Sequence, residues 1–218
     1  PQGHLTIGLG FSKKVPVTLK NMLENIVMGI KFDPREVILH HEEGVDVIPS
    51  NKLLSGLDVS LIMAEDREII LREYLMLLKE DYDFMIIDCM PSLGMLTINA
   101  LTAADSVLIP MEPEYYAADG LMELLKVYSA IKAKFNPDLK IEGIVFTFDT
   151  PTFNNSKRNK KAVISTYGDK IRIFKESIPR AVTIAETASE GISIFAYDGS
   201  GKGAQSYQKL VEGVLDHA

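Results

Sequence analysis

The sequence predicts an α/β fold: a doubly wound, mostly parallel sheet with helices on both faces. Short apolar runs, typical of buried parallel strands, alternate with amphipathic segments of ten or more residues, typical of helices. No Asn-Gly or Asp-Gly turn joins two strand-like runs, since Asp198-Gly199 is followed by a helical pattern. A length of 218 residues is enough for one domain with a core of its own. We therefore expect a single domain over residues 1–218.

The first third of the chain predicts two helices and a short strand. Apolar residues recur with helical spacing from Leu19 to Ile30, and Thr18 stands where an N-cap belongs. Alternation over residues 45–48 indicates a strand, and a second helix is expected over residues 64–79. The inner side of that second helix is expected to carry Ile69, Ile70, Tyr74, Leu77 and Leu78.

The middle of the chain carries the strands expected at the centre of the sheet. Residues 84–87 are all apolar and end in Asp88, as a fully buried parallel strand would. A second strand is expected over residues 107–110 and a third over residues 141–148, with a helix over residues 117–135 between them. This strand–helix–strand order is that of a parallel sheet.

The last part predicts shorter strands at residues 171–174 and 192–195, then an amphipathic helix over residues 204–215. In open parallel sheets, ligands bind beyond the carboxyl ends of the strands. Binding residues are therefore expected in four segments, 88–94, 110–116, 147–155 and 179–180.

Composition excludes several classes of protein. The single Cys89 rules out an internal disulfide and cysteine-ligated zinc, which favours a reducing, cytosolic compartment. The four histidines are scattered without the spacing of a metal site. No apolar run approaches the about 18 residues of a membrane span. A net charge of −7 argues against a protein that coats nucleic acid with its whole surface.

Positive charge is nevertheless concentrated in one segment, residues 157–180. It has two acidic residues, Asp169 and Glu176, against eight basic ones: Lys157, Arg158, Lys160, Lys161, Lys170, Arg172, Lys175 and Arg180. Such a stripe can hold phosphate backbones without reading sequence. The alternative is a solvated helix face.

Asp88 is the strongest candidate for chemistry. A carboxylate at the exit of a buried strand is how P-loop NTPases hold the water shell of Mg²⁺. The alternative is an Asp that only caps the following turn. Neighbouring residues favour the first reading, because the whole run Asp81–Gly94 resembles the Walker B and switch segment of the ParA/Soj partitioning ATPases, within the MinD/ParA class of deviant P-loop proteins.

The resemblance continues in order along the chain. Pro1–Thr6 is similar to the stretch after the family's second strand, with His4 where the family usually has Asn. The later matching segments are Asn99–Leu101, Ala103–Pro110, Glu114–Ala117, Ile178–Arg180 and Gly203–Tyr207. The loop Phe148–Thr152 departs from the family's Tyr-Asp-Pro-Arg-Thr, so the contacts of this loop stay open between a base pocket and an ordinary surface loop.

The resemblance implies a function and a set of residues for it. ATP and Mg²⁺ would be the cofactors, and Asp88 would serve hydrolysis by positioning Mg²⁺ through water. The switch would comprise Pro91, Ser92 and Gly94, and the adenine would lie near Thr147, Phe148 and Pro179. Nonspecific DNA would be held by Lys157, Arg158, Lys160, Lys161 and Lys202, whereas a second basic position of the family is Thr183 here.

The same resemblance implies partners and a location. The ATP-bound protein would be a homodimer on DNA in the cytoplasm, associated with the nucleoid, and a ParB-like partner would stimulate hydrolysis. The C-terminal helix is amphipathic but not basic, unlike the membrane-binding helix of MinD-like relatives, so no membrane association is expected.

One part of the family pattern does not occur in the sequence. No Gly-x-x-x-x-Gly-Lys-Ser/Thr is present among the 218 residues. The family's P-loop, with its first strand, first helix and second strand, would lie upstream of Pro1, so we expect an N-terminally incomplete domain that is inactive alone. Two alternatives stay open: a non-catalytic scaffold that kept the fold and the basic face, and a metabolic P-loop relative with a small-molecule substrate.

Overall fold

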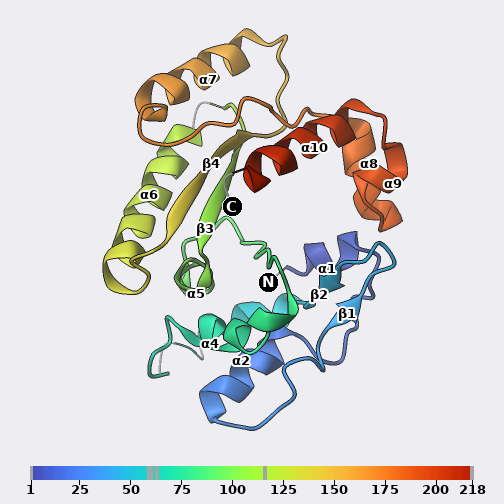
Figure 1. Ribbon diagram of the computed structural model, residues 1–218, viewed down its shortest axis with the longest axis vertical. Coiled ribbons are helices and arrows are strands. Elements are labelled where there is room, and N and C mark those ends of the chain that lie inside the picture. The colour runs from blue at the N-terminus through green and yellow to red at the C-terminus, as the bar shows by residue number, and fades with distance from the viewer. Residues whose placement is uncertain (1, 58–60, 62–63, 115–116, 217–218) are drawn as a thin grey trace. The chain divides into compact units, whose positions relative to one another are not determined.

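The computed structural model describes residues 2–57, 61, 64–114 and 117–216, so the matching segments Pro1–Thr6 and Glu114–Ala117 lie partly outside the described residues. The chain forms two compact units, shown with their elements in Figure 1. The first unit comprises Pro1–Ala104, Val127–Asp138 and Ala188–Ile192, and the second comprises Asp105–Lys126, Leu139–Thr187 and Ser193–Ala218.

The first unit is mainly helical. Its elements are α1 (His4–Gly8), α2 (Leu19–Met28), β1 (Leu39–His40), β2 (Asp46–Val47), η1 (Lys52–Gly56), α4 (Ile70–Met76), η2 (Lys79–Asp81) and α5 (Met95–Ala103). The expected cap is present, because the Thr18 backbone N–H donates to Asn21 Oδ1 at 3.0 Å. The expected strand at 45–48 is the two-residue β2, which pairs antiparallel with β1.

The core of the first unit gathers apolar side chains of α2, η1 and α4. Met22, Tyr74 and Leu78 are completely buried. The helix expected over residues 64–79 is shorter, because α4 begins only at Ile70 and ends at Met76. Leu77, expected on the inner side, is exposed, since the chain leaves the α-helical path just ahead of it.

The strand expected over residues 84–87 is not formed, and this prediction is wrong. Residues 84–90 have no regular structure, and Phe84 and Ile86 are exposed. An apolar run can fill a buried strand, but its backbone N–H and C=O groups also need a neighbouring strand. Within the described ranges, no strand pairs with this segment.

The second unit contains the parallel sheet. β3 (Ser106–Met111) and β4 (Lys140–Phe146) pair in parallel, as expected, with Val107 opposite Ile141 and Ile109 opposite Ile144. Its helices are the first parts of α6 (Ala117–Lys134) and α8 (Val182–Glu190), together with α7 (Asn154–Tyr167), α9 (Ile194–Asp198) and α10 (Lys202–Leu215). Both α6 and α10 match the expected helices to within two residues.

Alternate side chains of β4 point to opposite faces of this sheet. Ile144 and Phe146 pack in one cluster with Val163 of α7, whereas Val145 packs in another with Leu210 of α10. Figure 1 shows α6 and α7 on one side of the strands and α10 on the other. The sheet of this unit is therefore covered by helices on both faces, which confirms the predicted α/β class.

A third extended segment runs beside β4. The Ile144 N–H donates to Arg172 O at 2.9 Å and the Phe174 N–H donates to Ile144 O at 2.9 Å. The strand expected at 171–174 is thereby reduced to a single parallel bridge between Ile144 and Ile173. Gly143 (φ 153°) fits this close approach, because a Cβ there would lie 2.7 Å from the Phe174 ring.

The strand expected at residues 192–195 is wrong, because these residues begin helix α9. Ser193 is the N-cap, and its side chain accepts a hydrogen bond from the Ala196 N–H at 3.1 Å. A Ser at the start of a short apolar run thus directs the chain into a helix.

Among the described residues, no helix has both the length and the apolar character needed to cross a membrane.

Candidate functional site

The candidate residues lie in both units, and each unit is described by itself. Asp88 belongs to the first unit and lies in the irregular segment 84–90. Its side chain is exposed and makes no hydrogen bond or ion pair within the part of the chain that the structure describes. The Asp88 carboxylate is therefore available to an external ligand.

The switch segment, Pro91–Gly94, leads directly into α5. Pro91 and Ser92 are exposed, and Gly94 is the N-cap of α5 with extended backbone. Thr97, which is buried, donates its hydroxyl hydrogen to the Ser92 carbonyl, five residues earlier and ahead of the helix. This hydrogen bond fixes the end of the switch segment to the helix that follows it.

Helix α5 is itself anchored by a buried amide. Asn99 is 1% exposed; its Oδ1 accepts from the Leu71 N–H at 3.0 Å and its Nδ2 donates to the Arg67 carbonyl at 2.7 Å. A buried amide with both ends satisfied holds α5 in one position against the start of α4. Asn99 therefore gives the switch segment a rigid C-terminal support.

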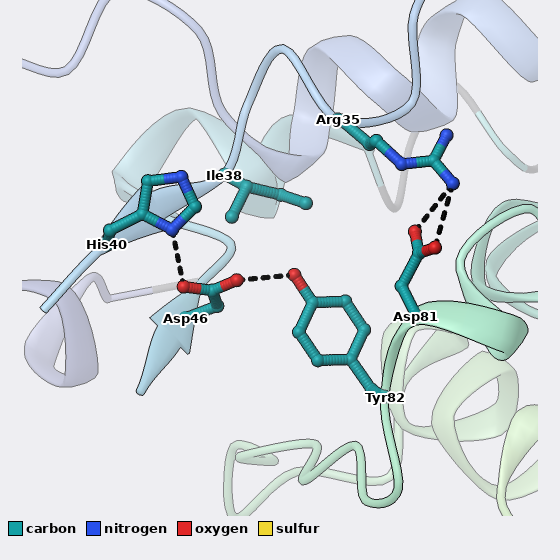
Figure 2. A pocket seen from close by; sticks show the side chains of 6 residues that line it. All are labelled: Arg35, Ile38, His40, Asp46, Asp81 and Tyr82. Carbon is teal, nitrogen blue, oxygen red and sulfur yellow. Dashed lines mark hydrogen bonds and ion pairs between the residues drawn. The ribbon is translucent and has the colours of Figure 1, made fainter. Parts of the chain in front are cut away.

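The residues ahead of the Asp88 segment are held by a polar network around a cavity of about 310 Å³. Figure 2 shows Arg35 bound to Asp81, and Asp46 bound to both Tyr82 and His40. The Tyr82 hydroxyl donates to Asp46 Oδ2 at 2.7 Å, and His40 Nδ1 lies 2.6 Å from Asp46 Oδ1. These contacts tie the start of the irregular segment to the β1–β2 hairpin.

The ionisation of this network follows from its contacts. The hydrogen bond from Tyr82, and then that from His40, holds the pKa of the Asp46 carboxyl below its usual range. Burial, and after it the hydrogen bond to Asp46, raises the pKa of Tyr82 to about 12. Tyr82 is therefore a protonated donor at neutral pH. Since Asp46 and His40 are exposed, we attribute to the network a role in positioning rather than a large stabilisation.

In the second unit, the residues predicted for the adenine pocket lie beyond the end of β4. The Thr147 N–H donates to Met111 O at 2.9 Å, which extends the β3–β4 ladder by one bond. Phe148 has φ 49° and is 53% exposed, with the Arg180 guanidinium 5.7 Å from the centroid of its ring. Asp149 forms a parallel bridge with Pro179. Thr147, Phe148 and Pro179 are thus brought together by the structure.

Behind the exposed Phe148 lies a buried charge. Asp149 is 4% exposed, and its carboxylate accepts hydrogen bonds from Ser156 Oγ at 2.8 Å and Lys160 Nζ at 2.7 Å. Burial alone would raise the pKa of Asp149, but the hydrogen bonds and the Lys160 charge together hold it below its ordinary value. Lys160 Nζ also donates to Ser177 Oγ at 2.9 Å and lies 5.1 Å from the Phe146 ring centroid.

Helix α7 separates its basic residues onto two faces. Lys157, Arg158 and Lys161 are exposed, and the helix contains no acidic residue. Lys160 instead falls one turn after the buried Ser156 and three residues before the buried Val163, so it belongs to the inward face. Lys202 is exposed at the first position of α10.

Sequence reasoning missed the Asp149 network and grouped Lys160 with its three exposed neighbours. The helical spacing of Ser156, Lys160 and Val163 was the signal that could have separated them. Arg172, counted in the basic stripe, is likewise engaged: it contacts Glu142 at 3.3 Å and the Gly213 carbonyl at 3.0 Å. Its charge is therefore partly neutralised within the unit.

Comparisons with known proteins place this chain in a family. Residues 1–141 match the family described as AAA domain. The chain is 39% identical to the sporulation initiation inhibitor protein Soj of Bacillus subtilis over 218 residues, which covers 98% of this chain and 83% of Soj. It is also 39% identical to the chromosome partitioning protein ParA of Myxococcus xanthus over 213 residues, covering 96% and 72% of the two chains.

A solved structure agrees with these sequence matches. The cobyrinic acid a,c-diamide synthase of Mycobacterium smegmatis, with bound ADP and magnesium, superposes with a TM-score of 0.84 at 32% identity, covering 100% of this chain and 79% of that one. The α/β fold and these similarities define a P-loop ATPase of the ParA/MinD type. Within that class, the chain belongs to the ParA/Soj family of partitioning ATPases. The resemblance noted in the sequence is confirmed.

Proposed function

We propose that the protein is an ATP-dependent partition ATPase that acts as a homodimer on nonspecific DNA, with a ParB-like protein as its partner. The observation that carries the proposal is the 39% identity to Soj over 218 residues. Chromosome or plasmid DNA would be its cargo, and the nucleoid in the cytoplasm its place of action. The proposal takes residues 1–218 as part of one ATPase domain.

Asp88 is proposed to position Mg²⁺ through a water molecule. The residue fits this role, because its carboxylate is exposed and engaged by no other described side chain. Mg²⁺ keeps several of its waters in nucleotide sites and would supply charge neutralisation at the phosphates. The relative from M. smegmatis was crystallised with ADP and magnesium. Pro91, Ser92 and Gly94 would then respond to the terminal phosphate, between the supports at Tyr82 and Thr97.

The adenine base is proposed to lie against Thr147, Phe148 and Pro179. The exposed Phe148 ring and the nearby proline offer a flat apolar surface for a base. Stacking needs only an aromatic face, so it is compatible with a loop sequence that differs from that of the family. The left-handed backbone of Phe148 supports the assignment, since such conformations cluster at ligand sites.

DNA contacts are proposed for Lys157, Arg158 and Lys161 of α7, together with Lys202. All four side chains are exposed and none is held by a carboxylate within the described residues. We leave Lys160 out of this set, because Asp149 and Ser177 already hold its ammonium group. Contacts of this kind recognise the phosphate backbone and not the base sequence.

The test is charge reversal of the three exposed α7 residues in the full-length gene product. Lys157→Glu, Arg158→Glu and Lys161→Glu together should abolish ATP-dependent retention of nonspecific DNA. A matched control reverses three exposed lysines elsewhere, Lys31, Lys52 and Lys79. Each single neutral variant of the α7 set should lower the salt slope of binding by about 0.9. Retention that persists with an unchanged slope would show that this face is only solvated.

A second candidate function is suggested by the similar structure from M. smegmatis, which is that of a diamide synthase. Such an enzyme would use ATP to convert a small-molecule carboxylic acid into an amide. It predicts ATP hydrolysis that depends on the acid and on a nitrogen donor, and that is indifferent to DNA. The higher identity to Soj and to the M. xanthus ParA favours partition.

A further inference from the structure

The buried ion pair between Asp149 and Lys160 joins three separate stretches of the second unit. Asp149 lies in the base loop, residues 147–149, and Lys160 lies on α7. Lys160 also binds Ser177, in the extended segment that leads to Pro179. Around the pair, the Asp149 N–H donates to Ile178 O at 3.1 Å and the Arg180 N–H donates to Asp149 O at 3.2 Å.

The residue next to this pair has an unfavourable backbone. Phe148 has φ 49°, in the left-handed region that a residue with a Cβ rarely adopts. Such a conformation persists only when the surroundings hold it. The groups that hold it here are on its C-terminal side, where the Asp149 side chain is fixed by Ser156 and Lys160 and the Asp149 backbone by Ile178 and Arg180.

The consequence of this backbone is the position of the Phe148 ring. The ring is half exposed and faces the Arg180 guanidinium instead of packing in the core clusters of the unit. Asp149, one residue further, has the opposite environment and is buried. The ion pair therefore lies directly beside the turn between an outward ring and an inward carboxylate.

We infer that Lys160 is a positioning residue for the nucleotide base: by holding Asp149, it keeps Phe148 in the conformation that presents its ring for stacking. The inference rests on the proposed function, in which Phe148 contacts the adenine. It assigns Lys160 a different role from Lys157, Arg158 and Lys161, whose ammonium and guanidinium groups face solvent. Buried ion pairs add little net stability but can fix one conformation, which suits this role.

The experiment compares two ligands in the full-length gene product, Mg²⁺-ATP and inorganic tripolyphosphate. Lys160→Met keeps the length of the side chain and removes its charge, and Lys161→Met is the matched exposed control. Lys160→Met should weaken ATP binding by about tenfold, in the range of a lost stacking contact, and leave tripolyphosphate binding unchanged. Lys161→Met should change neither affinity.

Further variants separate failure of the inference from failure of the proposed base site. If Phe148→Ala leaves ATP affinity unchanged, the base site itself is misplaced. If Phe148→Ala weakens ATP binding and Lys160→Met does not, the inference is overturned. The double variant should bind ATP no more weakly than Phe148→Ala alone, because Lys160 acts through the ring. Equal loss for ATP and tripolyphosphate would also overturn it.

Two further measurements test whether Lys160→Met disturbs only the base loop, and whether Lys160 itself contacts DNA. Hydrogen exchange of the Asp149 and Phe153 amides, which donate to Ile178 O and Thr150 O, should be faster in Lys160→Met than in Lys161→Met, while the amides of β4 stay protected. The salt slope of DNA binding should stay unchanged in Lys160→Met and fall by about 0.9 in Lys161→Met. The reverse pattern would return Lys160 to the DNA-binding face. If Lys160→Met does not fold, Lys160→Arg should keep the ATP affinity, and a loss there would overturn the inference.

Discussion

The Asp149–Lys160 pair predicts an asymmetry between the two single substitutions that remove it. Lys160→Met leaves a carboxylate that is 4% exposed and removes its ammonium partner, although the Ser156 hydroxyl can still donate to it. Breaking a buried pair in this way costs about 3–5 kcal/mol, and the lower end, about 3 kcal/mol, applies because the Lys160 side chain is itself 26% exposed and opens the site to water.

Asp149→Asn is expected to be milder. The asparagine oxygen can still accept from Ser156 or Lys160, and the ammonium group keeps Ser177 and its access to solvent. The expected loss is about 1.5 kcal/mol, the lower end for a hydrogen bond to a charged group, because the Lys160 side chain is partly exposed. The double variant should recover at least about 1 kcal/mol relative to Lys160→Met, because it no longer buries an unpaired charge.

Urea unfolding at pH 7 measures these differences, with Lys161→Met as a control expected within about 0.5 kcal/mol of the parent. In thermal unfolding, about 3 kcal/mol corresponds to a lowering of Tm by about 6–12 °C in a chain of this size. If Asp149→Asn proves as costly as Lys160→Met, or if the double variant is the least stable of the three, the reasoning from burial is refuted.

Three other predictions follow from the same structure. Between pH 5 and pH 3 the parent should lose more stability than Asp149→Asn, and urea midpoints measured over this pH range will detect the difference. Because the folded-state pKa of Asp149 is lowered, the stability that this carboxylate contributes is fully present above its unfolded pKa of about 3.9 and is lost as pH falls through its folded pKa. Asp88→Ala in the full-length gene product should reduce ATP turnover far more than thermal stability, because the side chain is exposed and makes no hydrogen bond or ion pair with the described residues. Unchanged turnover with normal Mg²⁺ dependence would remove Asp88 from the mechanism. Calorimetric titration of the 218 residues alone with Mg²⁺-ATP should show no micromolar binding, because these residues contain no Gly-x-x-x-x-Gly-Lys-Ser/Thr. The loss of three charge-assisted contacts to phosphate weakens binding about a thousandfold or more, so micromolar binding would reveal a phosphate site elsewhere.

Sequence reasoning succeeded where local pattern and environment agree. Helices α2, α6 and α10 have apolar residues at helical spacing, and strands β3 and β4 are apolar runs that do pair with each other. The run at 84–87 looks the same in sequence as β3, yet a strand depends on a neighbour that one-dimensional pattern does not reveal. At 192–195, the capping hydrogen bond of Ser193 outweighed the apolar run.

The candidate site, like the fold, could be predicted from the sequence only in part. Family motifs pointed to Asp88, the switch segment and the base loop as candidates, because short motifs associate particular residues with a chemistry, and the roles of these residues stay predictions. The role of Lys160 was not accessible by counting charges, since its partner Asp149 is eleven residues away and Ser177 is further still. Only the packing of α7 against the base loop distinguishes a held lysine from an exposed one.

ATP-dependent DNA retention by the full-length gene product tests the central claim most directly. The protein would be incubated with nonspecific duplex DNA in Mg²⁺ with ATP, with ADP or without nucleotide, and retention measured over a series of salt concentrations. The account predicts retention with ATP alone, steeply weakened by salt and abolished by reversing the charges of Lys157, Arg158 and Lys161. Retention that is equal in all three nucleotide conditions, or absent in all of them, would contradict it.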